Sequence, residues 1–227
     1  MIVGLLTVVL AACGTGGTNG DTDKDTNANS GTEGGGEAEK TYSIAISQYV
    51  EHPSLDATRE GFLAALKDAG IEVGKNLTLD YNNAQDDATN NLSIAEKIAA
   101  GNYDLVLAIA TPSATAVAKA VTNMPVLFAA VTDPLGSKLV DNLEAPSGNV
   151  TGASDTNPEA TRMLMNFIAE HFPNVKTVGI VINEGEENAV VMANMAEEAL
   201  AEHGIKVLRA AVANTSEVKQ AAQSLVS

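Results

Sequence analysis

The chain has 227 residues, of which 45% are hydrophobic and only 4% aromatic, and it contains no tryptophan. A chain of this length forms one or two domains and can bury a sizeable core. Its formal net charge of −16 argues against DNA, RNA or an anionic lipid surface as a partner, because each of them would repel the protein.

The first residues have the pattern of a targeting segment. Residues 1–10, MIVGLLTVVL, are almost purely apolar, and Leu-Ala-Ala leads directly to the single cysteine, Cys13. An apolar run that ends in small residues is typical of a secretory signal, and it is too short for a membrane-spanning helix of about 20 residues. A cysteine at this place resembles the bacterial lipoprotein box, in which Cys13 would become the lipidated mature N-terminus. The alternative is a buried N-terminal strand or short helix with a chance cysteine.

Residues 14–40 contain no large apolar side chain. Such a segment cannot bury enough surface to offset the entropy of ordering it, so we predict a disordered tether. The predicted organisation is therefore a lipoprotein signal at 1–13, a tether at 14–40, an N-terminal α/β lobe at 41–152 and a partial C-terminal α/β lobe at 153–227.

From Thr41 onward, strand patterns and helix patterns alternate. Strands are predicted at 42–48, 77–82, 104–110 and 125–131, and amphipathic or alanine-rich helices at 54–70, 86–101 and 112–121. Gly70 and Gly101 are placed to end two of these helices. The alternation predicts βαβ units and hence a parallel sheet covered by helices on both faces.

The pattern then starts again. Ile44 and Val178 lie 134 residues apart, and so do Gly70 and Gly204, in stretches of similar sequence. Two similar Rossmann-like lobes are therefore predicted, joined by residues 143–160, which are rich in Gly, Pro, Ser and Asn. The second lobe reaches Ser227 within its second helix, so we expect it to be incomplete by roughly 90–110 residues. The alternative is a naturally short second lobe.

Ligands of open parallel sheets bind beyond the carboxyl ends of the strands. One loop there holds Thr111, Pro112 and Ser113. Thr111 is expected to cap the following helix and Pro112 to fill its first position. The amides of Ser113 and Ala114 are then expected to be free and, with the helix dipole, to bind a carboxylate or phosphate. Helix capping without any ligand is the alternative.

Other loops at the same sheet edge offer polar side chains. Asp133 could receive a ligand ammonium group or cap the turn that begins at Pro134, and Asp155 lies similarly near the crossing between lobes. His52 is either a polar contact or a solvated loop residue. The sequence has no Gly-x-Ser-x-Gly elbow, no HExxH and no Walker loop, so we expect no enzyme.

Four stretches together resemble the tryptophan/tyrosine-type family of ABC transporter substrate-binding proteins. They are IAISQYVEHPSLDATREGFLAAL (44–66), LVLAIATPSATAVAKA (105–120), PVLFAAVTDPLGSKLV (125–140) and NVTGASD (149–155), and the resemblance covers about residues 42–225. It implies a two-lobed fold of the type I periplasmic-binding kind that closes on a small ligand by hinge motion. It also implies an extracytoplasmic monomer, lipid-anchored through Cys13, with no cofactor, that passes an amino acid, expected to be aromatic, to permease and ATPase subunits.

The resemblance also implies roles for individual residues. The helix start at Thr111, Pro112, Ser113 and Ala114 would hold the ligand carboxylate. The other implied ligand contacts are Gln48 and His52 on the first-lobe wall, Thr132, Asp133 and Pro134 in the next loop, Ser154 and Asp155 at the crossing, and Glu187 and Asn188 in lobe two.

The second-lobe loop departs from the family pattern. Ala189 replaces a hydroxyl, and Glu184 and Glu186 add charge, changes that bear on which ligand side chain is preferred. Two other functions stay open: a ligand sensor for a membrane kinase, and an importer receptor for another solute such as a sugar. The small, polar loops disfavour a sugar.

Overall fold

A computed structural model describes residues 40–226 of the chain. The predicted lipoprotein signal, Cys13 and almost all of the predicted tether lie outside these residues. Among the helices of residues 40–226, none combines the length and the apolar character needed to cross a membrane.

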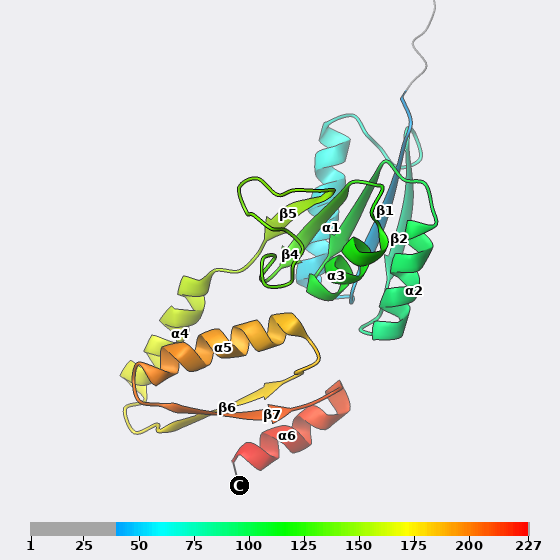
Figure 1. Ribbon diagram of the computed structural model, residues 1–227. Coiled ribbons are helices and arrows are strands. Elements are labelled where there is room, and N and C mark those ends of the chain that lie inside the picture. The colour runs from blue at the N-terminus through cyan, green and yellow to red at the C-terminus, as the bar shows by residue number, and fades with distance from the viewer. Residues whose placement is uncertain (1–39, 227) are drawn as a thin grey trace, which may run out of the picture. The chain divides into compact units, whose positions relative to one another are not determined.

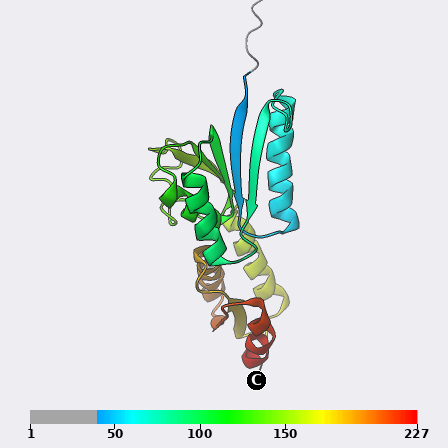
Figure 2. The same cartoon turned by 90° about the vertical axis from the view of Figure 1, so that its right-hand side faces the viewer.

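The first lobe is built on a five-stranded, all-parallel sheet with the strand order β2-β1-β3-β4-β5 (Figure 1). Helix α1 lies on one face of this sheet, and α2 and α3 lie on the other (Figure 2). The elements are β1 (Tyr42–Gln48), α1 (Pro53–Asp68), β2 (Leu77–Asn83), α2 (Ala88–Ala99), β3 (Leu105–Ile109), α3 (Thr111–Ala120), β4 (Val126–Val131) and β5 (Val150–Ser154).

Each face of this sheet has its own core. On one face, Ile46 and Ile109 pack in a cluster that includes Phe62 of α1. On the other face, Val106 and Phe128 pack in a cluster with residues of α2 and α3, including Ile98 and Val117. Alternate residues of a strand point to opposite faces, so strands covered on both faces need apolar residues on both sides, as β3 (LVLAI) and β4 (VLFAAV) have. In β1 the apolar run is Ile44 to Ile46.

The second lobe contains a two-stranded parallel sheet, β6-β7. Helices α4 and α5 lie on one side of it and α6 on the other (Figure 1). Its core is a separate cluster that includes Met165, Leu200 and Ile205. The elements are α4 (Pro158–His171), β6 (Thr177–Ile182), α5 (Glu187–Ala201), β7 (Lys206–Ala211), the short 3-10 helix η1 (Thr215–Glu217) and α6 (Val218–Leu225).

The predicted repeat is confirmed at the ends of two helices. Gly70 and Gly204 both have left-handed backbone conformations, with φ of 81° and 69°. The following residues make the same hydrogen bond: Ile71 N donates to Leu66 O at 2.8 Å, and Ile205 N donates to Leu200 O at 3.1 Å. These are the bonds of a helix that ends on a left-handed glycine, repeated 134 residues later.

Two elements were not predicted, because both fall within or directly after the stretch 143–160. Strand β5 extends the first lobe to Ser154, beyond the predicted boundary at 152. It carries Gly152, at which an added Cβ would lie 2.1 Å from the carbonyl oxygen of Phe128. A glycine is thus required where the two strands approach each other. Helix α4 follows, and four of the large apolar residues of this region are exposed: Met163, Leu164, Phe167 and Phe172.

Candidate functional site

A cavity of about 290 Å³ is lined by residues of both lobes. This volume is close to the lower end of the range for small-molecule pockets, about 300 Å³. The first lobe contributes Tyr49 after β1, one side of α2 and one side of α3, and the second lobe contributes the residues around the start of α5. The lining residues are Tyr49, Ala88, Asn91, Leu92, Thr111, Pro112, Thr115, Ala116, Lys119, Gly185, Glu186, Glu187 and Asn188.

Four residues predicted as ligand contacts lie in the wall of this cavity. They are Thr111 and Pro112 at the start of α3, and Glu187 and Asn188 at the start of α5. The other predicted contacts do not line it. The cavity therefore brings together the start of α3 and the start of α5, which belong to different lobes and lie far apart in the sequence.

The start of α3 differs from the prediction in detail. Thr111 is the first residue of the helix rather than its cap, Pro112 is the second, and the residue before them, Ala110, has no capping side chain. The Thr111 hydroxyl instead accepts a hydrogen bond from Thr132 N at 3.3 Å. The prediction of a free Ala114 amide is wrong, because Ala114 N donates to Ala110 O at 3.0 Å.

Ser113 is fully buried, and its hydroxyl is used inside the fold. It donates to Asn91 Oδ1 at 3.0 Å and accepts from Ser47 Oγ at 3.4 Å. Asn91 in turn donates to Pro112 O at 3.0 Å. These bonds fix the first turn of α3 against α2 and β1. In the first turn of α3, the backbone N–H groups without an intrahelical acceptor are those of Thr111 and Ser113, because Pro112 has no N–H.

Three predicted contacts have structural partners instead of facing the cavity. The Gln48 side chain is completely buried and bonds to the loop and helix that follow it. His52 caps α1, with its ring Nδ1 accepting from Ser54 N at 3.3 Å. Asp133 caps the turn that follows β4, because its Oδ1 accepts from Gly136 N at 2.9 Å, which is the alternative that the sequence left open.

The remaining predicted contacts lie around the end of β4. Ser154 Oγ donates to Thr132 O at 3.3 Å, and Asp155 N donates to Val131 O at 3.3 Å. Pro134 is buried beneath the turn that Asp133 caps. A role as ligand contact stays a prediction for every predicted contact that does not line the cavity: Gln48, His52, Ser113, Ala114, Thr132, Asp133, Pro134, Ser154 and Asp155.

Asn188 presents an unsatisfied polar atom at the cavity wall. Its side-chain oxygen is buried and has no hydrogen-bond partner within residues 40–226. A buried acceptor without a donor costs about 1–3 kcal/mol, and the large majority of such groups in folded proteins are paired. A ligand that carries an N–H or ammonium group into the cavity would supply the missing donor.

Carboxylates of both lobes surround Tyr49. Burial is the largest of the causes that together raise the pKa of the Tyr49 phenol to about 12. The others are the negative charges of Asp86, Glu186 and Asp87 and a hydrogen bond to Asp86. Asp86 and Asp87 belong to the first lobe and Glu186 to the second. This part of the cavity is therefore electronegative, which favours the positively charged end of a ligand.

The raised pKa of Tyr49 predicts alkaline destabilisation. The folded state holds the phenol proton more tightly than the unfolded chain, in which the pKa is near 10.0. This contribution is complete below pH 10 and is lost as the pH rises towards about 12. Urea unfolding at several pH values in this range measures the loss of stability. The loss should be smaller in Tyr49→Phe than in the control Tyr42→Phe. Equal pH slopes in the two variants would contradict the assignment.

Ala110 directs the chain from β3 into α3 through a strained backbone. Its φ of 78° and ψ of 151° lie in a region adopted almost only by glycine, at a cost of about 1–3 kcal/mol. Strain of this kind collects at functional sites, and this residue directly precedes the cavity-lining Thr111.

Ala110→Gly is therefore expected to raise the free energy of unfolding by about 1 kcal/mol, after the entropic cost of glycine is subtracted. Ala108→Gly is the matched control, because Ala108 lies in the same strand and is not among the residues with positive φ. It should lower the stability by about 0.5–1 kcal/mol. Urea midpoints of the two variants test this; a loss of stability in both would show that Ala110 is not strained.

Sequence reasoning considered only loops and therefore missed the helix faces of the cavity. On α2 the missed residues are Ala88, Asn91 and Leu92, and on α3 they are Thr115, Ala116 and Lys119. Each set is spaced at three and four residues, so each lies on one side of its helix. Tyr49, Gly185 and Glu186 lie in loops beside predicted contacts and were not themselves predicted as contacts.

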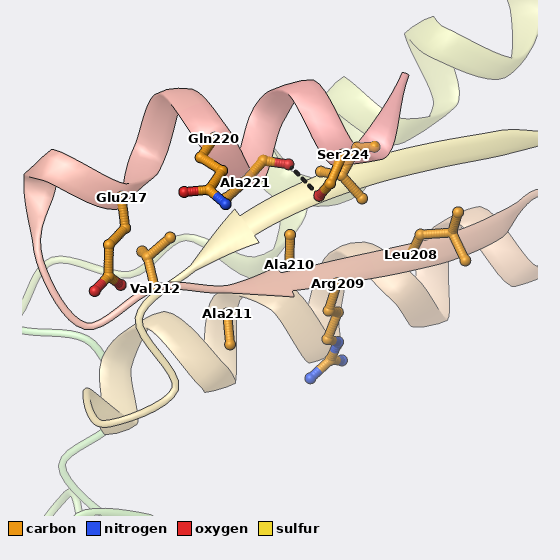
Figure 3. Close-up of a pocket in the computed structure, with 10 residues that line it drawn as sticks. Leu208, Arg209, Ala210, Ala211, Val212, Glu217, Gln220, Ala221 and Ser224 are labelled. Atoms are coloured by element: carbon orange, nitrogen blue, oxygen red, sulfur yellow. Dashed lines mark hydrogen bonds between the residues drawn. The ribbon is translucent and has the colours of Figure 1, made fainter. Parts of the chain in front are cut away.

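A larger hollow, of about 650 Å³, lies along β7 and α6 in the second lobe (Figure 3). Its side chains come from that lobe alone, and they include Leu208, Ala210, Gln220 and Ala221. Arg209, at its border, is held by Glu197 and Asn194 of α5. Because it joins no residues of the first lobe, this hollow does not serve as the shared site, despite its size.

Comparison with known proteins identifies the relatives of the chain. Residues 43–227 match the sequence pattern of the family described as ABC transporter substrate binding protein. The "Tyrosine-binding protein" of Clostridioides difficile is 37% identical over 227 residues, which is 100% of this chain and 63% of that protein.

Two solved structures are also similar. A conserved domain protein from Vibrio cholerae O1 biovar El Tor is 45% identical with a TM-score of 0.77. The ABC domain from Streptococcus pneumoniae in complex with L-Trp is 33% identical with a TM-score of 0.76. In both cases the alignment covers 82% of this chain and 62% of the other. The chain thus spans less than two thirds of the length of these relatives.

These likenesses bear on two predictions. The α/β fold with parallel sheets agrees with the type I periplasmic-binding kind found among the similar solved structures, and the partial coverage of those structures is consistent with an incomplete second lobe. The expectation of a binding protein rather than an enzyme agrees with the matched family, whose members are substrate-binding proteins.

Proposed function

Because the chain belongs to the ABC transporter substrate-binding protein family, we propose that it is the extracytoplasmic receptor of an ABC importer. It captures a small ligand, an amino acid with an aromatic side chain preferred, in the cavity between its lobes and delivers it to the permease. Lipidation of Cys13 would hold it at the membrane. Two relatives support an aromatic ligand: one bears the name "Tyrosine-binding protein", and another was solved with L-Trp.

The observation that carries this proposal is the buried, unpaired oxygen of Asn188 in a cavity that both lobes line. An amino acid brings an ammonium group, which can donate to Asn188 and is attracted by the carboxylates around Tyr49. Asp133, the predicted partner of the ammonium, is already engaged in its own turn. We therefore place the ammonium beside Asn188, Asp86 and Glu186.

The ligand carboxylate has a site at the start of α3. The amides of Thr111 and Ser113 lie in the first turn of this helix, where the positive end of the dipole favours an anion. The Tyr49 ring and the apolar side chains of Leu92 and Ala116 line the same cavity and offer contacts for a ligand ring.

A thermal-shift experiment tests the proposal with probes that differ by one group. L-tryptophan, L-tyrosine and L-phenylalanine are compared with tryptamine, which lacks the carboxylate, and indole-3-propionate, which lacks the ammonium. A ligand at 100 times its dissociation constant adds about 2.7 kcal/mol to the unfolding free energy. We expect the amino acids to raise the melting temperature and both truncated probes to fail; glucose is the control for a sugar receptor.

The variant Asn188→Leu separates the ammonium site from the rest of the cavity. It removes the unpaired oxygen, so it should leave the unliganded protein at least as stable as the parent. It should also lower the affinity for L-tryptophan by about tenfold or more, the equivalent of one charge-assisted hydrogen bond. A flat response of the parent protein to every amino acid would contradict the proposed substrate class. A shift with tryptamine equal to that with tryptophan would contradict the carboxylate site.

A further inference from the structure

The loop between β1 and α1 carries Tyr49 to the cavity, and the neighbouring Gln48 side chain ties this loop down. Gln48 Nε2 donates to Val50 O and to Asp56 Oδ1, both at 2.9 Å. The side chain is 0% exposed. Because its two N–H groups have separate partners, the amide has a single orientation, and Tyr49 lies in the short ring that the bond to Val50 closes.

Arg59 on α1 completes this arrangement. Its Nη1 donates to Gln48 Oε1 at 2.9 Å and to Asp56 Oδ1 at 3.0 Å. The same nitrogen donates to the Tyr81 hydroxyl at 2.7 Å, and the guanidinium lies 4.5 Å from the centre of that ring. The Gln48 amide is thus bonded to side chains of α1, and α1 is bonded to β2 through Arg59. The loop after β1 is therefore fixed to both α1 and β2 by one connected network.

The Tyr49 backbone also bonds to the loop between β2 and α2, whose Asp86 carboxylate lies beside the Tyr49 phenol. Tyr49 N donates to Ile109 O at 3.3 Å, and Tyr49 O accepts from Asp86 N at 3.0 Å. Asp86 has a φ of 61°, and Gln85 before it a φ of 57°. Two successive non-glycine residues in the left-handed region are strained. The bond to Tyr49 O therefore helps to hold Asp86, together with the bonds from Gln85 N to Asn83 Oδ1 and from Asp87 N to Ala84 O.

We infer that Gln48 is a positioning residue, which acts through Val50, Asp56 and Arg59 to hold Tyr49 at the cavity and Asp86 beside the Tyr49 phenol. In this role it acts on the cavity without lining it. Its removal frees the Val50 carbonyl, lets the Tyr49 ring turn towards solvent and loosens the loop that carries Asp86. Its effect on ligand affinity rests on the proposed function, whereas its effect on Tyr49 does not.

The test measures the reactivity of the Tyr49 ring, without any ligand, in the 227-residue protein. Tetranitromethane nitrates the phenolate form, and peptide mass spectrometry reports each of the four tyrosines separately. In Gln48→Met, a long unbranched side chain fills the space and all three hydrogen bonds are lost. We expect nitration of Tyr49 at pH 8 to become about tenfold faster, which corresponds to a fall in its pKa of about one unit.

Tyr81→Phe is the matched control, because it removes a hydrogen bond from Arg59 but leaves the bond from Gln48 to Val50 in place. It should destabilise the protein to a similar extent and leave the nitration rate of Tyr49 unchanged. Arg59→Lys is the second variant, in case Gln48→Met does not fold. Lysine lacks the planar, forked guanidinium that contacts Gln48, Asp56 and Tyr81, so Tyr49 should react about threefold faster, an intermediate effect.

The outcomes separate this inference from the proposed function. Unchanged Tyr49 nitration in a folded Gln48→Met protein overturns the inference, and so does an equal acceleration in Tyr81→Phe, which would mean a general loosening. Faster nitration with tryptophan affinity also lowered supports both. Faster nitration in a protein that binds none of the amino acids supports the positioning role and counts against the proposed function alone.

Discussion

Replacing Leu200 by alanine is expected to unfold the second lobe while the first lobe stays folded. Leu200 is 0% exposed and lies in the cluster that holds α4 and α5 against β6 and β7. A buried Leu→Ala substitution costs about 2.7–5.0 kcal/mol, and whole domains are stable by only about 5–15 kcal/mol. The second lobe has one small core, and this core shares no residue with the two cores of the first lobe.

Hydrogen exchange measured by mass spectrometry distinguishes the lobes. In Leu200→Ala we expect protection to be lost across 158–211 and to be kept in β1, β3 and β4. Leu143→Ala is the control, because Leu143 is 65% exposed and its loss should change stability by less than about 0.5 kcal/mol. Loss of protection in both lobes together would mean that the described chain unfolds as a single unit.

The fold was predictable wherever local pattern and tertiary position agree. β3 and β4 are covered on both faces, and so they appear in the sequence as uninterrupted apolar runs, while β1 has a shorter run at Ile44 to Ile46. The glycines at the ends of α1 and α5 are required by their left-handed backbone, and so the repeat could be read from them. β5 could not be predicted, because most of its residues are exposed and because Gly152 disfavours a strand. Gly152 is required by its close contact with Phe128 of β4.

The candidate site was predictable only in part, for a different reason. Four of the residues predicted as ligand contacts line the cavity. Sequence does not reveal whether a polar side chain at such a loop is already satisfied. Ser113, His52 and Asp133 each have partners within the fold, whereas the side-chain oxygen of Asn188 has none among the described residues. Whether a polar side-chain atom already has a hydrogen-bond partner therefore separates the candidate ligand contacts better than residue type does.

The second large effect is expected from Thr115→Arg, which fills the cavity from the middle of α3. Thr115 lines the cavity, and its hydroxyl donates to Thr111 O at 2.8 Å. An arginine at this position can reach the carboxylates around Tyr49 and take the place of the ligand ammonium. We expect the affinity for L-tryptophan to fall at least about a hundredfold, or 2.7 kcal/mol, by isothermal titration calorimetry.

Thr58→Arg provides a closely matched control. Thr58 also lies inside a helix, is also half-buried, and also donates to the carbonyl four residues earlier, at 2.9 Å to Ser54 O. It lies on α1 and does not line the cavity, so affinity should be retained. If both arginine variants bind L-tryptophan like the parent protein, the ligand does not occupy this cavity. If both lose binding equally, the loss reflects the added charge and bulk on any helix and not the position of Thr115.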